Sequence, residues 1–356
     1  MQTIRENIEQ GLGEKRIGPF AHALLYALSL AYGAGVRARA ALYHTGIIRS
    51  KKLPCKVISV GNITVGGSGK TPMVVHIAER LSETGLRVLV LSRGYKRSGS
   101  GTEVVADGEK VLLDPRRAGD EPYLMATRLD GVPVMVGTDR VEAGLCGIER
   151  FSPDVIILDD AFQHLRIKRD LDIMLVDSRR GFGSGYLLPR GPLREPLSGI
   201  NRADIVMIKG EGEFRLPWSV AQEKPVFRFS YIPKGLVGPD GELPGGVDRL
   251  RGRMIAALAG IADPASFFQT LERLGAVVTK TLAYPDHHWY TADDAERIKR
   301  EADGTELLVT TEKDLARLDV HGLGEVPVAA LVIDVDVEDA ERFLTLVRKK
   351  LGLQGS

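Results

Sequence analysis

The glycine-rich segment at residues 66–71, GGSGKT, constrains the fold of this chain more than any other feature. A short β-branched run at residues 56–60 precedes it, and residues 71–83 are predicted to form a helix. A turn of this kind between a strand and a helix points backbone N–H groups at phosphates, and the helix start favours the bound anion. Thr64 stands where the general pattern has a glycine, so Gly66 and Gly67 would supply the flexibility. The segment predicts a phosphate-binding loop, or P-loop.

Short apolar runs follow the P-loop along the chain. They occupy residues 88–91, 132–136, 155–158, 173–176 and 205–208. Runs without strict alternation are typical of parallel strands buried on both faces, and a repeated order of strand and helix indicates an α/β domain. The predicted fold is therefore α/β, with a P-loop NTPase-like, mostly parallel sheet that has helices on both faces.

A smaller α/β domain is predicted at the C-terminal end. Residues 225–250 contain an aromatic strand and then many prolines and glycines, which indicates a β-containing linker between domains. Further strands are predicted near residues 255–258, 307–310 and 328–333, and a final helix at 337–350. The predicted divisions are an N-terminal helical segment at 1–50, the P-loop domain at 51–224, the linker at 225–250 and the C-terminal domain at 251–356.

The segment at residues 18–50 is unusually apolar. Residues 20–36 are almost free of charge, and several arginines and lysines follow them. An apolar run of about 17 residues is at the lower limit for crossing a bilayer, and Gly33 and Gly35 interrupt it. From these residues alone, a helix lying in the membrane interface and a helix packed on the protein's own core are equally supported.

Charge and cysteine content argue against some classes of protein. The chain has 48 basic and 47 acidic residues, without the basic excess of a dedicated nucleic-acid binder. Cys55 and Cys146 match no metal-binding spacing and are predicted to be reduced thiols of a cytosolic protein. Residues 1–17 contain three glutamates and do not resemble the basic start of a signal peptide.

Two acidic pairs are candidates for chemistry next to the P-loop. Asp159 and Asp160 follow the run at 155–158, and the carboxyl ends of parallel strands face a ligand crevice. One carboxylate would hold Mg²⁺ and the other would orient a substrate hydroxyl, whereas the alternative is a solvated strand end. Asp120 and Glu121 precede a predicted helix, where Asp120 is either a functional residue or a helix cap.

Three further segments carry candidate residues. Residues 179–202 hold five arginines and one acid among prolines and glycines, which suits phosphate recognition as well as a solvated face, and Arg93 would join this cluster. The segment at 284–290 contains His287 and His288 and is either a proton relay or a structural loop. Residues 311–314, TEKD, lack the spacing of a guanine-reading motif but would bring Lys313 toward the cleft between the domains.

In this order, the motifs resemble the tetraacyldisaccharide 4′-kinase family, the lipid A 4′-kinases, over nearly the whole chain. The matching segments are VGN at 60–62, GGSGKTP at 66–72, SRGY at 92–95, GDEP at 119–122, DDAFQH at 159–164, LLP at 187–189, GPLREP at 191–196 and PDHH at 285–288. The resemblance implies ATP- and Mg²⁺-dependent phosphorylation of the 4′-hydroxyl of a tetraacylated glucosamine disaccharide 1-phosphate. The product is lipid IVA, an intermediate of lipid A and lipopolysaccharide biosynthesis. The resemblance also implies that the N-terminal helix contacts the membrane surface, with the enzyme peripheral or monotopic at the cytoplasmic face of the bacterial inner membrane.

The resemblance assigns roles to individual residues. It implies that Asp120 is the catalytic base and His287 its dyad partner, although the sequence alone does not separate His287 from His288. It also leaves open which of Asp159 and Asp160 contacts Mg²⁺ directly. The predicted site residues are Asp120, His287, Lys70 and Asp160 for catalysis; Gly66, Gly67, Ser68, Gly69, Lys70 and Thr71 for ATP; Arg93, Tyr95, Glu121, Arg140, Asp159, Gln163, His164, Arg194 and Glu195 for the substrate; and Thr71, Asp159 and Asp160 for the metal.

A P-loop alone does not define a reaction, so two other classes remain as alternatives. A membrane-recruited P-loop ATPase that acts as a switch or positions cargo would explain the apolar helix and the loop. It would need neither a base, nor an arginine-rich substrate loop, nor histidines on a second domain. The other alternative is a kinase or ligase acting on a soluble small molecule. Nucleic acid is not among the expected partners.

Overall fold

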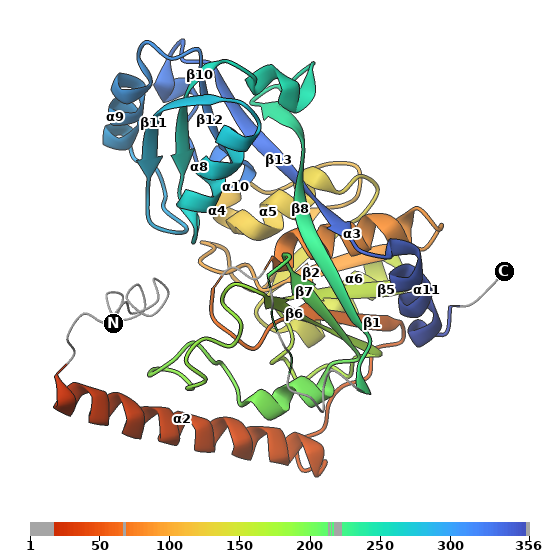
Figure 1. The fold of residues 1–356 in the computed structure, drawn as a ribbon. Helices are drawn as coiled ribbons and strands as arrows, with labels where there is room; N and C mark the ends of the chain where they lie inside the picture. Colours follow the sequence, from red (N-terminus) through yellow and green to blue (C-terminus); the bar gives the residue numbers. More distant parts are fainter. Residues whose placement is uncertain (1–17, 67–68, 213, 215, 217–222, 354–356) are drawn as a thin grey trace.

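The computed structural model describes residues 18–66, 69–212, 214, 216 and 223–353. Its strands form one 13-stranded sheet, in the order β11-β10-β12-β13-β8-β7-β6-β1-β5-β2-β4-β3, with β9 paired to β8 (Figure 1). The strands are β1 (Lys56–Gly61), β2 (Val88–Ser92), β3 (Thr102–Ala106), β4 (Val134–Gly137), β5 (Val155–Asp159), β6 (Leu171–Asp177), β7 (Ile205–Lys209), β8 (Val226–Gly238), β9 (Gly241–Glu242), β10 (Met254–Ala259), β11 (Val277–Ala283), β12 (Leu307–Thr311) and β13 (Val328–Val337).

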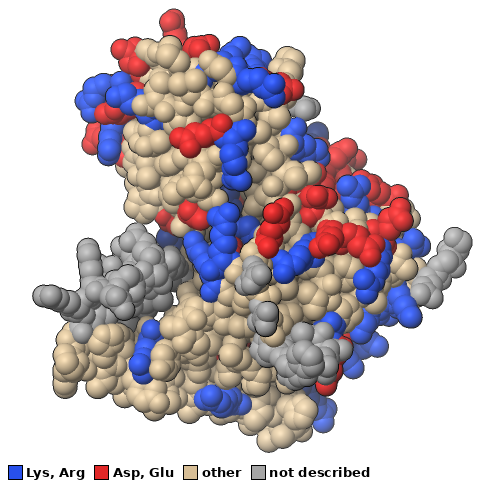
Figure 2. Space-filling model, viewed as in Figure 1, with Lys and Arg blue, Asp and Glu red and all other residues tan. Residues whose placement is uncertain are grey.

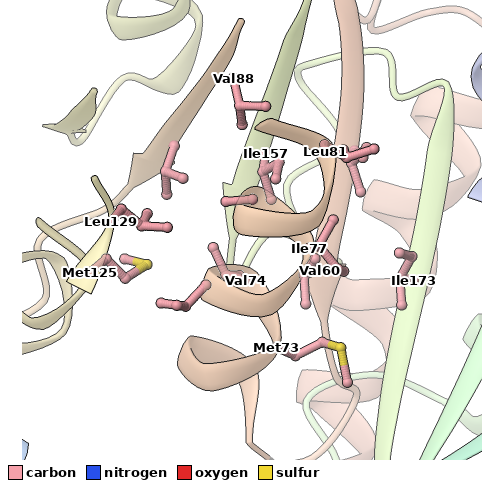
Figure 3. Packing of buried hydrophobic residues seen from close by; sticks show 14 of the residues in the cluster. Val60, Met73, Val74, Ile77, Leu81, Val88, Met125, Leu129, Ile157 and Ile173 are labelled. Carbon is pink, nitrogen blue, oxygen red and sulfur yellow. The ribbon is translucent and has the colours of Figure 1, made fainter. Parts of the chain in front are cut away.

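The first half of the sheet is parallel from β7 to β4, with β3 antiparallel at its edge. Helices cover both faces: α3 (Lys70–Ser82), α5 (Asp120–Arg128) and α11 (Ala340–Leu351) pack on one face, and α6 (Arg140–Phe151) packs on the other. Figure 3 shows how Val74, Ile77 and Leu81 of α3 lie against the sheet, with Met125 beside them. These residues recur at helical spacing, so their burial explains why this segment forms a helix on the sheet.

The second half of the sheet forms a smaller unit at the C-terminal end. Strand β10 lies between β11 and β12 in parallel pairings. Helix α8 (Pro264–Arg273) packs on one face through Phe267 and Leu271, and α9 (Ala292–Ala302) packs on the other through Ile298. The described residues therefore confirm the predicted α/β class, with a mostly parallel sheet.

Two long antiparallel strands connect the two halves. One end of β8 pairs with β7, and β13 pairs with β12 at its own first residues. Between these ends β8 and β13 pair with each other, from Phe229 opposite Val337 to Val237 opposite Ala330. Figure 1 shows both as long arrows that run from one unit into the other. Since hydrogen bonds between two strands hold this connection, it is a ribbon and not a loose chain.

The last helix differs from its expected position. It begins at Ala340, whereas the sequence predicted a helix from residue 337, because β13 continues to Val337. Val335 and Val337 alternate toward the first core, which is a strand pattern. Helix α11 then packs through Phe343 and Val347 on the core of the first half. The predicted domain boundaries remain a prediction, and this packing returns the chain end to the P-loop unit.

The N-terminal helix α2 (Pro19–His44) lies along the outside of the first half (Figure 1). Only Ser29 and Gly33 in it are buried, while large apolar side chains such as Phe20 and Leu30 are exposed. Figure 2 shows few charged side chains on this part of the surface. Among the described helices, it is the one that is long and apolar enough to cross a membrane by length and composition. Of the residues in its most apolar 18-residue stretch, 11% are buried. Packing on the protein's own core therefore does not account for its apolar surface.

Two leucines in the layer formed by α6 and the sheet, one buried and one exposed, give a stability prediction with its control. Leu89 of β2 is fully buried, and Leu145 of α6 is 43% exposed. Leu89→Ala is expected to lower the free energy of unfolding by about 2–5 kcal/mol, because it leaves a cavity in the core. Leu145→Ala is expected to change it by less than about 0.5 kcal/mol. Urea unfolding followed by circular dichroism measures both, and equal effects would contradict the described packing.

Candidate active site

A cleft of about 1540 Å³ lies where the two halves of the sheet meet. Every predicted site residue that the structure describes lines it, apart from Asp120, which lies just behind. Gly67 and Ser68 lie outside the described residues. In Figure 2, lysine and arginine side chains gather between the upper and lower units. The structure therefore brings the predicted motifs together at one site, from the P-loop at Gly66 to the TEKD segment at Lys313.

The P-loop lies between β1 and the N-terminus of α3. Gly66 and Gly69 have φ values of 103° and 87°, a backbone conformation that side chains other than glycine rarely adopt. A Cβ at Gly69 would also clash with the hydroxyl oxygen of Tyr231. Lys70 and Thr71 begin α3, so both stand at a helix N-terminus, where bound anions are favoured.

Asp160 lies between two cations at the end of β5. Its Oδ1 atom is 3.7 Å from Lys70 Nζ, and Arg194 Nη1 donates to Oδ1 at 2.8 Å and to Oδ2 at 2.9 Å. Although burial opposes ionisation, Lys70 and Arg194 lower the pKa of Asp160 to about 2. Asp160 also has φ 45°, an unusual value for a residue other than glycine, so the chain turns sharply there. The carboxylate is therefore fixed and ionised beside the P-loop lysine.

Asp159 has a different environment from its neighbour. Its Oδ2 atom accepts a hydrogen bond from Ser92 at 3.0 Å, while Oδ1 is buried with no hydrogen-bond partner in the described structure. Burial, with the nearby charges of Glu121 and Asp160, raises the pKa of Asp159. A buried carboxylate oxygen without a partner is suited to a cation, and Thr71 lies on the same cleft.

No group of three or more His, Cys, Asp or Glu side chains suited to a metal occurs among the described residues. This finding leaves the expected Mg²⁺ site open, because Mg²⁺ at a P-loop is usually held by one or two protein oxygens together with phosphates and water. The donor set of Asp159, Asp160 and Thr71 fits that kind of site.

A carboxylate and an imidazole from different halves of the molecule meet at the cleft. Asp120 Oδ2 and His287 Nδ1 are 2.7 Å apart. The side chain of Asp120 is 7% exposed and that of His287 is 20% exposed, so the imidazole lies nearer the cleft. His287, in the loop after β11, has φ 59°, a backbone conformation that is unusual for a residue other than glycine. His288 instead pairs with Asp294, whose side chain also accepts the backbone N–H of Thr291, the N-cap residue of α9.

Asp120 does not cap α5. The N-cap residue of this helix is Gly119, with no side-chain cap, and Asp120 is the first helical residue. Burial raises the pKa of Asp120, but the hydrogen bond from His287 and the charges of Lys313 and Arg317 outweigh it and lower the pKa. The carboxylate is therefore ionised at neutral pH although it is almost fully buried.

Two arginines of the arginine-rich loop, Arg194 and Arg202, form ion pairs within the protein. Glu195 is buried and accepts from Gln163 Nε2 at 2.8 Å and from Arg202 Nη2 at 2.7 Å. Arg140 is buried and donates to the carbonyl oxygen of Asp159 at 2.8 Å. These bonds support the strand end that carries the two aspartates.

Arg93 and Tyr95 line the cleft, and the Tyr95 ring meets the His287 ring edge to face, with 5.7 Å between the ring centroids.

Three residues of α2 near the site were not predicted from the sequence, whereas Lys313 was expected to approach the cleft. Helix α2 contacts the site loops through Ser29, Tyr32 and Arg39, which donate to the carbonyl oxygens of Leu187, Arg194 and Gln163. From the second half, Lys313 Nζ pairs with Glu121 Oε1 at 2.7 Å. The TEKD segment gave a sequence signal for Lys313, whereas an isolated Ser, Tyr or Arg gives none.

Comparison with known proteins relates this chain to one family over nearly its whole length. A model of the family described as Tetraacyldisaccharide-1-P 4′-kinase matches residues 21–352. The tetraacyldisaccharide 4′-kinase of Desulfatibacillum aliphaticivorans is 43% identical over 99% of both chains, and that of Syntrophus aciditrophicus (strain SB) is 43% identical over 92% of both. A crystal structure of the "apo" form of LpxK from Aquifex aeolicus in complex with ATP is similar, with a TM-score of 0.78 and 36% identity, over 93% of this chain and 99% of that one.

His164 gives a prediction about stability and pH. Its Nε2 atom is buried without a hydrogen-bond partner, and burial, followed by the charges of Arg140 and Arg169, lowers its pKa from 6.5 to about 4. Between these two pH values the unfolded chain binds more protons at this residue, so stability falls as the pH falls. His164→Gln is expected to reduce this fall in the melting temperature between pH 6.5 and pH 4. His321→Gln, at an exposed position, is the control, and an equal effect of both would contradict the prediction.

Proposed function

Because the chain belongs to the tetraacyldisaccharide-1-P 4′-kinase family, we propose that its cleft is the active site. There the γ-phosphate of ATP is transferred to the 4′-hydroxyl of a tetraacylated glucosamine disaccharide 1-phosphate. The chain is a lipid kinase of lipid A biosynthesis, and the product of the reaction is lipid IVA. One observation carries the assignment to residues: the P-loop lysine and the Asp120–His287 pair reach the same cleft from different parts of the molecule.

The P-loop side of the cleft would hold the phosphates of ATP. The backbone at Gly66 and Gly69 and the start of α3 direct N–H groups at the anion, and Lys70 neutralises the β- and γ-phosphate oxygens. We propose that Thr71, Asp159 and Asp160 hold Mg²⁺, with Asp159 Oδ1 as the available buried oxygen. When bound, the ion would supply further charge neutralisation at the phosphate oxygens. Asp160 would also keep Lys70 in place through their ion pair.

The Asp120–His287 pair would accept the proton of the acceptor hydroxyl. As the oxygen–phosphorus bond forms, the bond from the γ-phosphorus to its bridging oxygen breaks and ADP leaves with that electron pair. Asp120 takes the hydroxyl proton, and His287 holds the carboxylate and shares the proton through its 2.7 Å contact. Arg93 and Tyr95, on the same wall, would orient the sugar, together with Glu121, Gln163, His164 and Arg194.

The exposed apolar face of α2 supports a membrane contact for this chain. Arg37 and Arg39 follow the apolar residues of the helix, and basic side chains near an apolar stripe favour lipid headgroups. We propose that α2 lies in the interface at the cytoplasmic face of the inner membrane, where ATP is available. The lipid acceptor would then reach the cleft directly from the bilayer surface.

An acceptor assay tests the proposed function. The purified protein is incubated with labelled ATP, Mg²⁺ and the detergent-dispersed disaccharide 1-phosphate, and the lipids are separated by chromatography. Label is expected in the disaccharide lipid. Parallel reactions with soluble glucosamine are expected to give none. ATP hydrolysis that is independent of any acceptor would instead support the P-loop ATPase alternative.

Asp120→Ala is expected to lower kcat by roughly 10²- to 10⁴-fold, the range for loss of a general base. His287→Ala is expected to lower kcat as well, and the double variant to lose little more than Asp120→Ala, because the two side chains act as one unit. His288→Ala is the neighbouring control, since its imidazole pairs with Asp294. Near-normal turnover of Asp120→Ala would refute its assignment as the base.

Three substitutions on α2 test the membrane contact. Phe20, Leu24 and Leu30 are 83%, 51% and 55% exposed, so replacing all three by serine should leave folding intact. The triple variant is expected to float less with vesicles that contain anionic lipid, because apolar surface is lost at the interface. The same substitutions at the exposed residues Val111, Leu112 and Leu145 serve as the control. Unchanged flotation would contradict the contact.

A further inference from the structure

The side chain of Arg317 lies just after the short helix α10 (Glu312–Leu315) and is completely buried, with 0% exposure. Two of its three nitrogens are anchored within its own half of the molecule. Nε donates to the carbonyl oxygen of Lys313 at 3.1 Å, and Nη2 donates to Asp314 Oδ1 at 2.7 Å and to the carbonyl oxygen of Gly260 at 3.1 Å. The guanidinium plane is therefore fixed before it meets anything from the other half.

The third nitrogen of Arg317 points at the catalytic carboxylate. Nη1 has no hydrogen-bond partner in the described structure, and it lies 3.5 Å from Asp120 Oδ2. The same oxygen atom contacts His287, while Oδ1 of Asp120 accepts the backbone N–H of Glu121 at 3.0 Å. Each carboxylate oxygen thus has a fixed neighbour, and the cation in this arrangement comes from the opposite half.

Asp314 makes this cation rigid. It is fully buried and accepts the N–H of Gly260, the hydroxyl of Tyr290 and the hydroxyl of Thr311, besides its bond to Arg317. A buried ion pair is costly unless its atoms are satisfied, and here every contact of Asp314 comes from the same half. The pair does not need Asp120 to hold it together, so the remaining N–H groups of Arg317 are available to act on Asp120.

We propose that Arg317 is a positioning residue for the phosphoryl transfer, which holds the Asp120 carboxylate in register with His287 when the two halves of the molecule meet. The inference rests on the proposed role of Asp120. A guanidinium suits this task better than an ammonium, because it has nitrogens in several fixed directions and binds both its anchor and its target. Arg317 is not itself among the residues that line the cleft, so it acts through Asp120.

A double-mutant cycle tests the proposal. Arg317→Met is expected to lower kcat by roughly 10- to 100-fold, the range typical of outer-shell partners of functional ligands, with the KM for ATP little changed. In an Asp120→Asn background the same change is expected to cost less than about twofold, since the residue through which Arg317 acts is already disabled. Arg317→Lys keeps the charge beside Asp314 and is expected to restore part of kcat. Arg300→Met, at an exposed position of α9, controls for loss of an arginine.

The outcomes separate this inference from the proposed function. Melting temperature is measured for each variant, and Arg317→Met combined with Asp314→Asn removes both charges if Arg317→Met alone unfolds. Equal losses of kcat with and without Asp120 would assign Arg317 a purely structural role and overturn the proposal, as would normal kcat in any folded variant without the guanidinium. A wild-type protein that transfers no phosphate to the lipid would refute the proposed function, and the inference with it.

Discussion

Parallel strands end at one edge of a sheet, and this constraint gathers the candidate site of this protein. The P-loop follows β1, Ser92 ends β2 and Asp159 ends β5, and the three strands are adjacent in the order β1, β5, β2. Segments that lie up to about 100 residues apart in sequence therefore meet without any special loop. The ion pair between Lys70 and Asp160 and the hydrogen bond between Ser92 and Asp159 are direct results of this strand order.

The second half of the sheet supplies what this edge lacks. It contributes His287, the buried guanidinium of Arg317 and the partly buried ammonium of Lys313, and charged contacts hold it to the first half. Arg128 on α5 donates to both carboxylate oxygens of Glu312 and to the carbonyl oxygen of Ile333, beside the pair formed by Lys313 and Glu121. These contacts are poorly exposed, so solvent screens them less than surface ion pairs. The β8–β13 ribbon leaves the two halves close enough for such contacts to form.

The sequence predicted the parts of the fold that follow from local pattern. The apolar runs correctly indicated β1, β2, β4, β5, β6 and β7, and the glycine-rich segment located the P-loop. The sequence analysis missed the edge strands β3 and β11. The side chains of β3 are partly or fully buried, those of β11 are mostly exposed, and the two strands include Thr102, Thr279 and Lys280, so neither an apolar run nor a clear alternation marks them. For the site, motifs with unusual composition were recognisable. Arg317 and the α2 contacts were not, because their roles depend on residues brought together only by folding.

The way α2 attaches to the rest of the molecule has a consequence for divergence among related enzymes. Ser29, Tyr32 and Arg39 all donate to main-chain carbonyl oxygens of the site loops. Every amino acid carries such an oxygen, so substitutions at the acceptor positions preserve these hydrogen bonds. Insertions or deletions in the loops shift the oxygens and break these bonds. The side chains of these loops can therefore change without loss of the α2 contact, provided that the length of each loop is kept.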